Sequence, residues 1–426
     1  MKRAAPLVLL AALVAAAGCT VNPVTGKSQI DLLGEAQEVQ IGNHLYPGAI
    51  QSSLGAIAGG DVQREVERVG EAVASVSHRP ELTYAFTAVN EPEVNAFALP
   101  GGKICITRGL LSRLDSEDGL AAVLGHEVGH VTARHVVSAY NRQLLLSAII
   151  VGGGVYMESE NVKNRGLITL GALAGGQLVL AHYSREQERQ ADELGLEYAV
   201  KAGYSPQGMI ETQKVLLGLQ KTQPGVVERL FASHPMSAER LATAEQRVGS
   251  LAAEVRGRGL RTRPYRTAMA GVISGRPAWD AAHEGVALLG QGKGAEAEAK
   301  LADAVRMAPT EGVLHTLHAV ALAKLQRKDA AVAEARDGAR LSPGVYISRL
   351  VAGELLLDPD AAAALENLGG AETLLPGQAR VSLLRGRAFE RLGRRDDARA
   401  AYDEAIKRDP GGDVGAEATR RVRNLG

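Results

Sequence analysis

Four prolines near the end of the chain recur at an almost constant interval. Pro309, Pro343, Pro376 and Pro410 are separated by 34, 33 and 34 residues, and each ends a block with helical spacing of its apolar residues. A repeat of this length is one unit of two helices that buries its apolar face by stacking on its neighbours. The spacing therefore predicts an α-helical solenoid.

The residues inside the blocks are typical of tetratricopeptide (TPR) repeats. Residues 379–410 carry a Leu-Gly pair near the end of the first helix, and Ala398 and Tyr402 lie one turn apart in the second. Residues 283–309 are a second clear copy, whereas residues 344–376 are degenerate and indicate an altered repeat. We expect at least three units to share one core.

Length and charge limit the remaining possibilities. A chain of 426 residues is long enough for two or three domains. Lys and Arg together number 48, as do Asp and Glu, so the formal net charge is zero. No excess of positive charge points to nucleic acid, and we expect no nucleic-acid partner.

The N-terminus predicts export. Lys2 and Arg3 precede an uncharged run rich in Ala and Leu that is shorter than the roughly 20 residues of a membrane span. Small residues then precede Cys19, as in the lipobox of bacterial lipoproteins, although Ala16 stands where Leu is commonest. We expect cleavage after residues 1–18 and lipidation of Cys19; an ordinary signal peptidase site after one of the alanines is the alternative.

Thr20 follows Cys19, where enterobacterial lipoproteins retained at the inner membrane usually carry Asp. We therefore expect a periplasmic protein whose lipid anchor holds it to the outer membrane. Cys105 is then left without a partner, and we expect no intrachain disulfide.

Residues 116–140 predict a helix that carries the candidate catalytic motif. Ser116 is suited to the N-cap, and acidic residues follow in the first turn. In the sequence HEVGH, His126 and His130 lie on one helical face, one turn apart. Two neutral imidazoles at this spacing can bind Zn²⁺, while Glu127 can act as general base and later as proton donor. HExxH alone is a moderate signal, and the third protein ligand must come from elsewhere.

One zincin pattern, HExxHxxGxxH, would place that ligand six residues after the second histidine. Val136 stands at this position and Ala133 stands where the glycine belongs, so the pattern is excluded. His135 lies one residue early, and we expect it to pack near the site or to support a ligand.

A second arrangement takes the ligand from a downstream helix. Residues 182–206 offer Glu188 and Asp192 at i and i+4 on one face, where Glu188 would bind zinc and Asp192 would accept the free N–H of an imidazole. Glu186 and Glu193 lie in the same charged helix, and spacing does not choose between these glutamates and Glu188.

His234 and Arg240 lie in the segment ASHPMSAER. In a functional interpretation His234 approaches the zinc site, where it donates to the oxyanion or occupies the open coordination position and silences the enzyme, and Arg240 supports the site from behind the ligands. The alternative is a His-Pro turn before a helix, with Arg240 in a surface ion pair.

Two apolar stretches within residues 94–111 are separated by Pro, Gly and Gly, which predicts a β-hairpin. Its first strand, with Asn95, Ala96, Phe97 and Ala98, is a candidate edge that pairs with an extended substrate through main-chain hydrogen bonds. A purely structural hairpin is the alternative.

Two glycine-rich apolar segments, residues 144–157 and 166–181, follow the candidate catalytic helix. Each is shorter than a bilayer span, and we expect helices that are buried or touch the membrane rather than cross it.

Five motifs occur in the order found in the zinc metallopeptidase family of the CAAX prenyl proteases and membrane heat-shock proteases. They are NAFALPGG, HEVGHVTARH, SREQERQAD, AGYSP and SHPMSAER. The chain resembles this family over about residues 20–250, and its export signal and TPR repeats make it most similar to a periplasmic branch.

The resemblance implies roles for individual residues. His126, His130 and Glu188 would be the zinc ligands, Glu127 the catalytic acid and base, and Asp192 a support behind them. It also implies a mostly helical, gluzincin-like domain with a small β-sheet.

We therefore expect a mainly α-helical protein of four parts. These are a lipoprotein signal peptide (1–18), a zinc metalloprotease domain with a small sheet or hairpin (19–255), a linker rich in Arg, Gly and Pro (256–280) and a TPR α-solenoid (281–426).

The predicted function is that of an exported metalloendopeptidase, with one Zn²⁺ per chain, that cleaves misfolded or misassembled cell-envelope proteins. The resemblance implies that the TPR domain binds polypeptide substrates or the outer-membrane protein assembly machinery. A TPR chaperone or assembly adaptor with a mostly latent protease site is the alternative. A purely structural zinc would need four protein ligands and is disfavoured by the intact HExxH.

Overall fold

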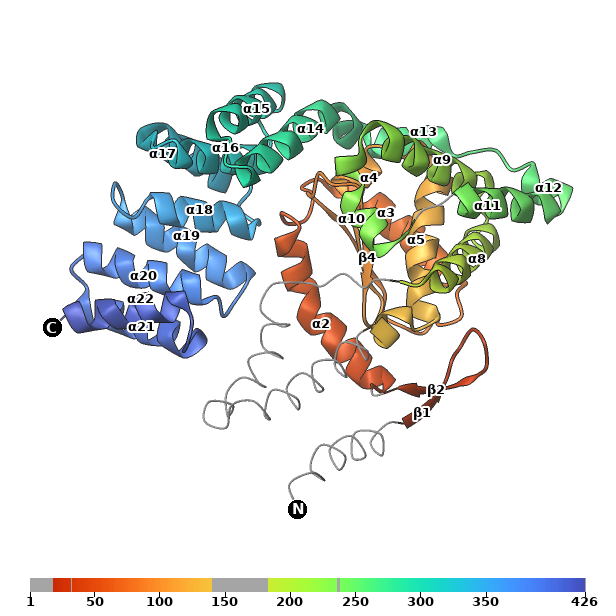
Figure 1. Ribbon diagram of the computed structural model, residues 1–426, viewed down its shortest axis with the longest axis horizontal. Helices are drawn as coiled ribbons and strands as arrows, with labels where there is room; N and C mark the ends of the chain where they lie inside the picture. Colours follow the sequence, from red (N-terminus) through yellow and green to blue (C-terminus); the bar gives the residue numbers. More distant parts are fainter. Residues whose placement is uncertain (1–17, 32, 140–182, 236–237, 426) are drawn as a thin grey trace, which may run out of the picture. The chain divides into compact units, whose positions relative to one another are not determined.

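The computed structural model of the protein describes residues 18–31, 33–139, 183–235 and 238–425. These residues are mainly helical, with two small sheets, so the predicted fold class is confirmed (Figure 1). The chain divides into two compact units. The first consists of residues 1–49, 59–89 and 93–273, and the second of residues 50–58, 90–92 and 274–426.

The elements of the first unit, of which α2 and α14 continue into the second, follow one another along the chain. They are β1 (Gly18–Val21), β2 (Ser28–Asp31), α2 (Glu35–Ser52), α3 (Gly60–Ala74), β3 (Ala85–Val89), β4 (Ala96–Leu99), β5 (Lys103–Thr107), α4 (Arg108–Leu111), α5 (Glu117–Thr132), α8 (Arg185–Lys201), α9 (Gln207–Thr222), η1 (Pro224–Val226), α10 (Glu228–Ser233), α11 (Ala238–Ser250), α12 (Ala253–Arg256), α13 (Thr262–Ala268) and α14 (Ala270–Gly290).

The sheet beside the catalytic motif has three described strands in the order β3-β5-β4. β5 pairs in parallel with β3 and in antiparallel with β4, so the predicted hairpin is confirmed. Its turn needs glycine, because Gly101 and Gly102 have φ values of 71° and 79°. Among the described strands β4 lies at an edge.

α5 runs through the core of the first unit. Every residue from Glu117 to Thr132 is buried, and the helix packs against α3, α8, α9 and β4. Ser116 caps it as predicted, because its hydroxyl accepts a hydrogen bond from the Gly119 amide. A helix buried on all sides holds its side chains in fixed positions, which suits a metal-binding motif.

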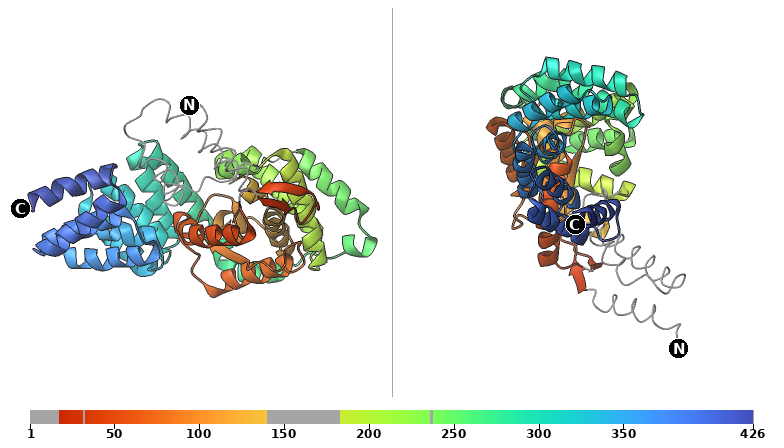
Figure 2. Two further views of the ribbon diagram at one scale, coloured as in Figure 1. Left: turned by 90° about the horizontal axis from the view of Figure 1, so that it is seen from below. Right: turned by 90° about the vertical axis from the view of Figure 1, so that its left-hand side faces the viewer.

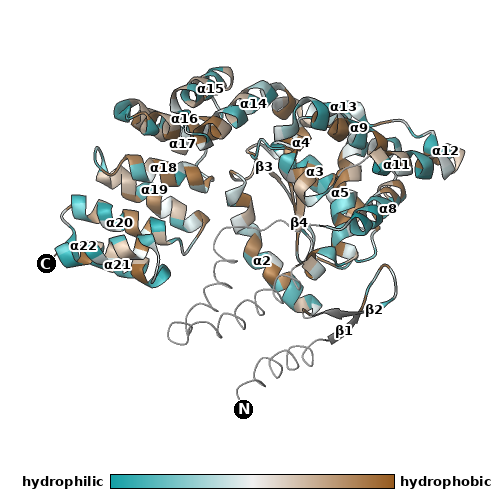
Figure 3. Cartoon of the chain, in the orientation of Figure 1, coloured by the Kyte–Doolittle hydropathy of each residue, from teal (hydrophilic) through white to brown (hydrophobic). Residues whose placement is uncertain are grey.

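α8 is mostly hydrophilic (Figure 3) yet packs closely on α5. It begins with a capping box in which Ser184 and Gln187 exchange hydrogen bonds. A Cβ on Gly125 of α5 would lie 2.8 Å from the Gly195 carbonyl oxygen of α8. The two backbones therefore meet directly, and only glycine allows this approach.

A buried group of charges holds the C-terminal end of α5. Arg79 and Arg134 both bind the Glu38 carboxylate, and Arg79 also donates to the carbonyl oxygen of Val131 in the last turn of α5. The Gly101 amide donates to the same Glu38 carboxylate at 3.2 Å. Opposite charges and backbone groups thus compensate each other in the interior, and they link α2, the hairpin turn and α5.

Helical pairs make up most of the second unit, and their helices follow each other in chain order from teal to blue (Figures 1 and 2). After α14 come α15 (Gly294–Met307), α16 (Gly312–Lys324), α17 (Lys328–Leu341), α18 (Tyr346–Leu355), α19 (Ala361–Leu374), α20 (Ala379–Arg391), α21 (Arg395–Arg408) and α22 (Asp413–Asn424).

The predicted solenoid is confirmed, and each repeating proline lies two residues after the end of the second helix of a pair. Ala398 and Tyr402 are buried, and a Cβ on Gly386 would lie 2.3 Å from the Tyr402 ring. The degenerate block 344–376 also forms a helix pair, α18 and α19. Most of the predicted linker 256–280 is occupied by α13 and the start of α14.

None of the helices in the described part of the chain combines the length and apolar character needed to cross a membrane. The predicted apolar segments 144–157 and 166–181 lie outside the described residues, as do residues 1–17 of the predicted signal peptide. Cys19 is in β1, and Cys105 in β5 is a buried free thiol.

Candidate metal centre

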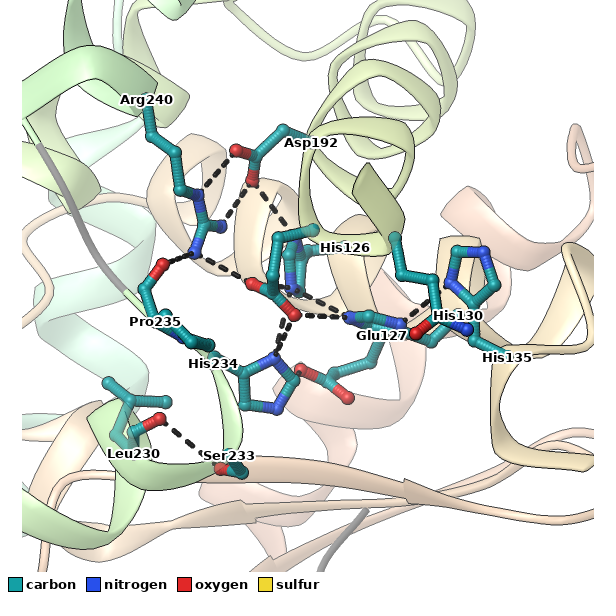
Figure 4. A network of polar contacts seen from close by, with 12 residues as sticks. His126, Glu127, His130, His135, Asp192, Leu230, Ser233, His234, Pro235 and Arg240 are labelled. Atoms are coloured by element: carbon teal, nitrogen blue, oxygen red, sulfur yellow. Dashed lines mark hydrogen bonds and ion pairs between the residues drawn. The ribbon is translucent and has the colours of Figure 1, made fainter. Parts of the chain in front are cut away.

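Four buried side chains with metal-binding atoms converge in the first unit. One potential donor atom from each of His126, His130, Glu188 and His234 lies within 4.8 Å of every other. Figure 4 shows the labelled members of this group and their hydrogen bonds. We refer to these four residues as the donor cluster.

Three helices position the four donors. His126 and His130 are one turn apart on α5, and Glu188 lies in the first turn of α8. His234 ends α10 as its C-cap, and its amide donates to the Leu230 carbonyl oxygen at 2.7 Å. The glycine contact between α5 and α8 brings the first three together.

Four of the six distances between the donor atoms are close to those of a tetrahedral zinc site. His126 Nε2 is 3.1 Å from His130 Nε2 and 3.3 Å from His234 Nδ1. Glu188 Oε1 is 3.3 Å from His130 Nε2 and 3.0 Å from His234 Nδ1. Zinc bonds of about 2.0–2.1 Å place tetrahedral donors about 3.3–3.4 Å apart. Nitrogen and carboxylate donors also suit zinc, so the cluster fits this metal.

Glu127 lies beside the cluster without belonging to it. Its Oε1 is 3.9 Å from His234 Nε2, and its Oε2 is buried without a hydrogen-bond partner among the described residues. Burial raises the pKa of Glu127, although the nearby His234 and His126 oppose this shift. A buried carboxylate oxygen seldom lacks a partner, and a water, ion or substrate bound there would supply the missing contact.

Asp192 and Arg240 support the donors from behind. Asp192 Oδ1 is 3.0 Å from His126 Nδ1, which fixes the orientation of that ring. Arg240 donates to both Asp192 oxygens at 2.6 and 2.7 Å and to Glu188 Oε2 at 2.7 Å. Although burial opposes ionisation, hydrogen bonds from His130 and His234 hold the pKa of Glu188 well below its usual range.

His135 and Tyr183 contact His130, and Gln190 contacts His135 in turn. His135 Nδ1 is 3.0 Å from His130 Nδ1, and its Nε2 is 3.0 Å from Gln190 Oε1, so His135 supports a donor as the sequence suggested. Tyr183 stacks on the His130 ring with centroids 3.8 Å apart. Tyr183 and Gln190 could not be identified from the sequence, because neither belongs to a recognisable spacing.

A largely apolar cavity opens onto the cluster. Its wall includes residues from α5, α9, α10 and β4, together with members of the centre. These are Ala96, Leu110, Ala122, Val123, His126, Glu127, Asp192, Met209, Thr212, Gln213, Leu216, Leu230, His234 and Arg240.

The structure also shows where the remaining candidate residues lie. Glu186 is exposed and Glu193 pairs with Arg247 on the surface, so neither competing glutamate reaches the cluster. Arg240 is buried in the site rather than in the alternative surface ion pair. In the hairpin, Ala96 lines the cavity, and Asn95, Phe97 and Ala98 are buried beside it.

Comparison with known proteins agrees with this arrangement. A model of peptidase family M48 matches residues 61–248, and a tetratricopeptide repeat model matches residues 359–413. The beta-barrel assembly-enhancing protease of Escherichia coli (strain K12) is 27% identical over 232 residues, which are 54% of this chain and 47% of that protein.

The mitochondrial metalloendopeptidase OMA1 of Arabidopsis thaliana is 34% identical over 145 residues, covering 34% of this chain and 28% of that protein. The chain therefore spans about half the length, or less, of each of these relatives. Among solved structures the TPR protein YrrB is 16% identical and covers 49% of this chain and 99% of that one, with a TM-score of 0.32.

The family match contains Glu127 and all four residues of the donor cluster. The resemblance indicated by the five sequence motifs is therefore confirmed, because residues 61–248 of this chain match the model of peptidase family M48.

Proposed function

We propose that this chain is a zinc-dependent metalloendopeptidase. The observation that carries the proposal is Glu127, whose buried and unpartnered Oε2 lies beside a cluster of donors with tetrahedral spacing. A bound zinc ion would polarise the substrate carbonyl and increase the acidity of water. A purely structural zinc site would not explain why the buried Glu127 carboxylate lies beside the metal donors.

In the proposed reaction Glu127 accepts a proton from the attacking water at Oε2. The water oxygen forms a bond to the peptide carbon, the carbon–nitrogen bond breaks, and Glu127 passes the proton to the leaving nitrogen. The raised pKa of Glu127 suits both transfers, because a carboxyl group whose pKa is closer to neutral pH can both accept and release a proton.

We infer that the substrate is a polypeptide bound in an extended conformation along β4. This strand is at the edge of the described sheet, and Ala96 from β4 lines the same cavity as Glu127. Main-chain pairing tolerates many sequences, while the apolar side chains of the cavity favour an apolar substrate residue next to the cleaved bond.

We further propose that the enzyme acts in the cell envelope on misfolded or misassembled outer-membrane proteins. Support comes from the export signal and Cys19 in the sequence and from the similarity to the beta-barrel assembly-enhancing protease. The periplasmic location, the lipid anchor on Cys19 and contact of the repeats with assembly machinery remain proposals.

A latent state of the site is a second candidate, because His234 is placed as a fourth protein donor. Its Nδ1 is 3.0 Å from Glu188 Oε1 and 3.3 Å from His126 Nε2, where a catalytic zinc site would leave an open position. In this state His234 would have to leave before water and substrate could bind.

Two variants test the proposed function in the full-length protein. We expect Glu127→Gln to keep one zinc per chain but to lose cleavage of an unfolded protein substrate by about 100-fold or more. Glu188→Ala should lose the zinc itself. Elemental analysis and a gel-based cleavage assay measure the two quantities separately.

The alternative chaperone function predicts a different outcome in cells. If Glu127→Gln complements a deletion strain as fully as the unchanged protein, proteolysis is dispensable and the repeats carry the function. Full cleavage by Glu127→Gln would contradict the mechanism itself.

A further inference from the structure

The second unit has an uneven distribution of charge along its repeats. Residues 281–378 contain 9 Lys or Arg and 13 Asp or Glu, whereas residues 379–425 contain 12 and 8. The first part is therefore net negative by about four charges and the last part net positive by about four. α22 in particular is largely hydrophilic (Figure 3).

A cavity is lined mostly by residues of this basic part. Its volume is about 250 Å³. It is lined by Leu357 after α18, by Arg387, Glu390 and Arg391 of α20, and by Arg421 of α22. The first helices of successive repeats thus supply its wall, and helical solenoids bind partners on extended surfaces to which several repeats contribute.

The charges in this cavity are not balanced. The only acid among the five lining residues is Glu390, which accepts a hydrogen bond from the Tyr402 hydroxyl and pairs with Arg421 at 2.9 Å. Arg391 pairs with Asp358 at 2.6 Å, but both side chains are more than half exposed. Such a surface pair is weak and easily exchanged.

Arg387 has no ion pair with any described residue and is only half-buried at the cavity wall. Its guanidinium group therefore keeps its donors free, and a planar fork of N–H groups matches a carboxylate. Arg391 lies one turn along the same helix and can add a second fork.

We propose that this cavity of the repeat unit binds a carboxylate group of a polypeptide. The carboxylate comes either from an acidic side chain or from the C-terminus of the bound chain, and it pairs with Arg387 and Arg391. Leu357 offers an apolar contact beside the charges. This binding does not depend on the metal centre.

Fluorescence anisotropy with labelled peptides tests the proposal. The protein is the full chain with Glu127→Gln, so that the probes stay intact. Three probes of equal length are compared, namely an acidic peptide with an amidated C-terminus, a neutral peptide with a free C-terminus and a neutral amidated peptide. Vesicles containing an anionic phospholipid serve as a fourth probe.

We expect one or both carboxylate peptides to bind and the neutral amidated peptide to bind at least about tenfold more weakly. Binding of the first probe identifies a side-chain carboxylate and binding of the second a C-terminal one. Arg387→Glu should weaken binding about tenfold or more, and Arg387→Gln, which carries less risk to the fold, several-fold.

Arg395 provides a matched control, because it begins α21, is exposed, has no ion pair among the described residues and does not line the cavity. Arg395→Glu changes the net charge by the same amount and should alter binding less than about threefold. Circular dichroism confirms that the variants keep their helices.

Three results would overturn the proposal. Equal weakening by the two charge reversals would indicate a general field rather than a site. Equal binding of the neutral amidated peptide would show that no carboxylate is recognised. Binding of the anionic vesicles without binding of any peptide would assign the basic surface to a membrane.

Discussion

Two carboxylates at the metal centre have surroundings that shift their pKa values in opposite directions. Burial raises the pKa of Glu127. Burial would also raise the pKa of Asp192, but hydrogen bonds from His126 and Arg240 lower it below its usual value. Glu127 is therefore suited to exchange a proton, and Asp192 to remain an anion that holds the His126 ring.

This arrangement makes Arg240 a positioning residue. We expect Arg240→Ala to weaken zinc binding about 10- to 100-fold, because Asp192 and Glu188 would lose their shared cation. Arg247 is a matched control on the same helix, since it pairs with the more exposed Glu193. Competition with a fluorescent chelator measures both affinities, and equal losses in the two variants would contradict this role.

His234→Ala separates the two roles considered for His234. If this residue occupies the open position of the metal, the variant should keep its zinc and cleave an unfolded substrate faster. If it stabilises the oxyanion, cleavage should fall about 100-fold or more. A variant with unchanged turnover and unchanged zinc affinity would exclude both roles.

At the scale of elements, the contact between α5 and α8 fixes the centre. A Cβ on Gly195 would lie 2.7 Å from the His126 amide nitrogen, a backbone atom in the middle of the buried α5. A backbone nitrogen in a buried helix cannot move aside as the end of a flexible side chain can. The two helices would therefore have to separate.

Gly195→Ala should therefore lower the free energy of unfolding by about 1–3 kcal/mol and weaken zinc binding. Gly218 lies inside α9 with open space where a Cβ would stand. There alanine should stabilise the helix by up to about 1 kcal/mol. Thermal unfolding followed by circular dichroism compares the two alanine variants. If Gly195→Ala were as stable as the unchanged protein, the helices could separate without a cost in stability.

The sequence predicted the helix with HEVGH, its cap and the hairpin, because these depend on local spacing. It did not select Glu188 by spacing alone from the glutamates around it. Ala191, Gly195 and Tyr198 continue the Glu188 face of α8 and are all small or buried. This stripe marks the face of α8 that packs on α5, and it could have selected Glu188 from the other glutamates.

At the scale of the whole molecule, the repeats were the most predictable part, because each helix pair contacts mainly its neighbours. The first unit depends on partners far apart in sequence. Glu38 binds Arg79 and Arg134, and neither pair forms a recognisable pattern in the chain. Such buried ion pairs follow from the tertiary fold and could not be predicted from spacing.

The repeats also contain a group of titrating residues. Glu334 of α17 binds His315 Nδ1 at 2.6 Å and lies 3.3 Å from His318 Nδ1, both on α16. Burial opposes the ionisation of Glu334, but these histidines lower its pKa to about 2. The pKa of His315 is raised chiefly by its hydrogen bond to Glu334. Burial lowers the pKa of His318, but Glu334 and Glu298 together more than offset this.

Because the pKa values of His315 and His318 are raised in the folded state, their protonation stabilises that state below about pH 6.5. This stabilisation is lost as the pH rises through the raised pKa values. The lowered pKa of Glu334 stabilises the fold above about pH 4.5, and that contribution is lost as pH falls towards about 2. We expect the melting temperature of the repeats to fall between about pH 6 and pH 8.5.

Glu334→Gln should reduce this pH dependence. Glu354→Gln is the control, because Glu354 pairs with the exposed Arg380 and with no histidine. Calorimetry of the full chain at the two pH values gives the comparison. An undiminished fall in Glu334→Gln would assign the pH dependence to other groups.

The direct backbone contact between Gly125 and Gly195 has a consequence for how the centre can be assembled. The helices themselves set the distance between the histidines of α5 and Glu188 of α8, whatever path the chain takes from Thr132 to Arg185. The metal donors therefore do not require an unbroken polypeptide between them. Two separately expressed fragments, one containing α5 and the other beginning before α8, carry the complementary surfaces from which a split enzyme could be reconstituted.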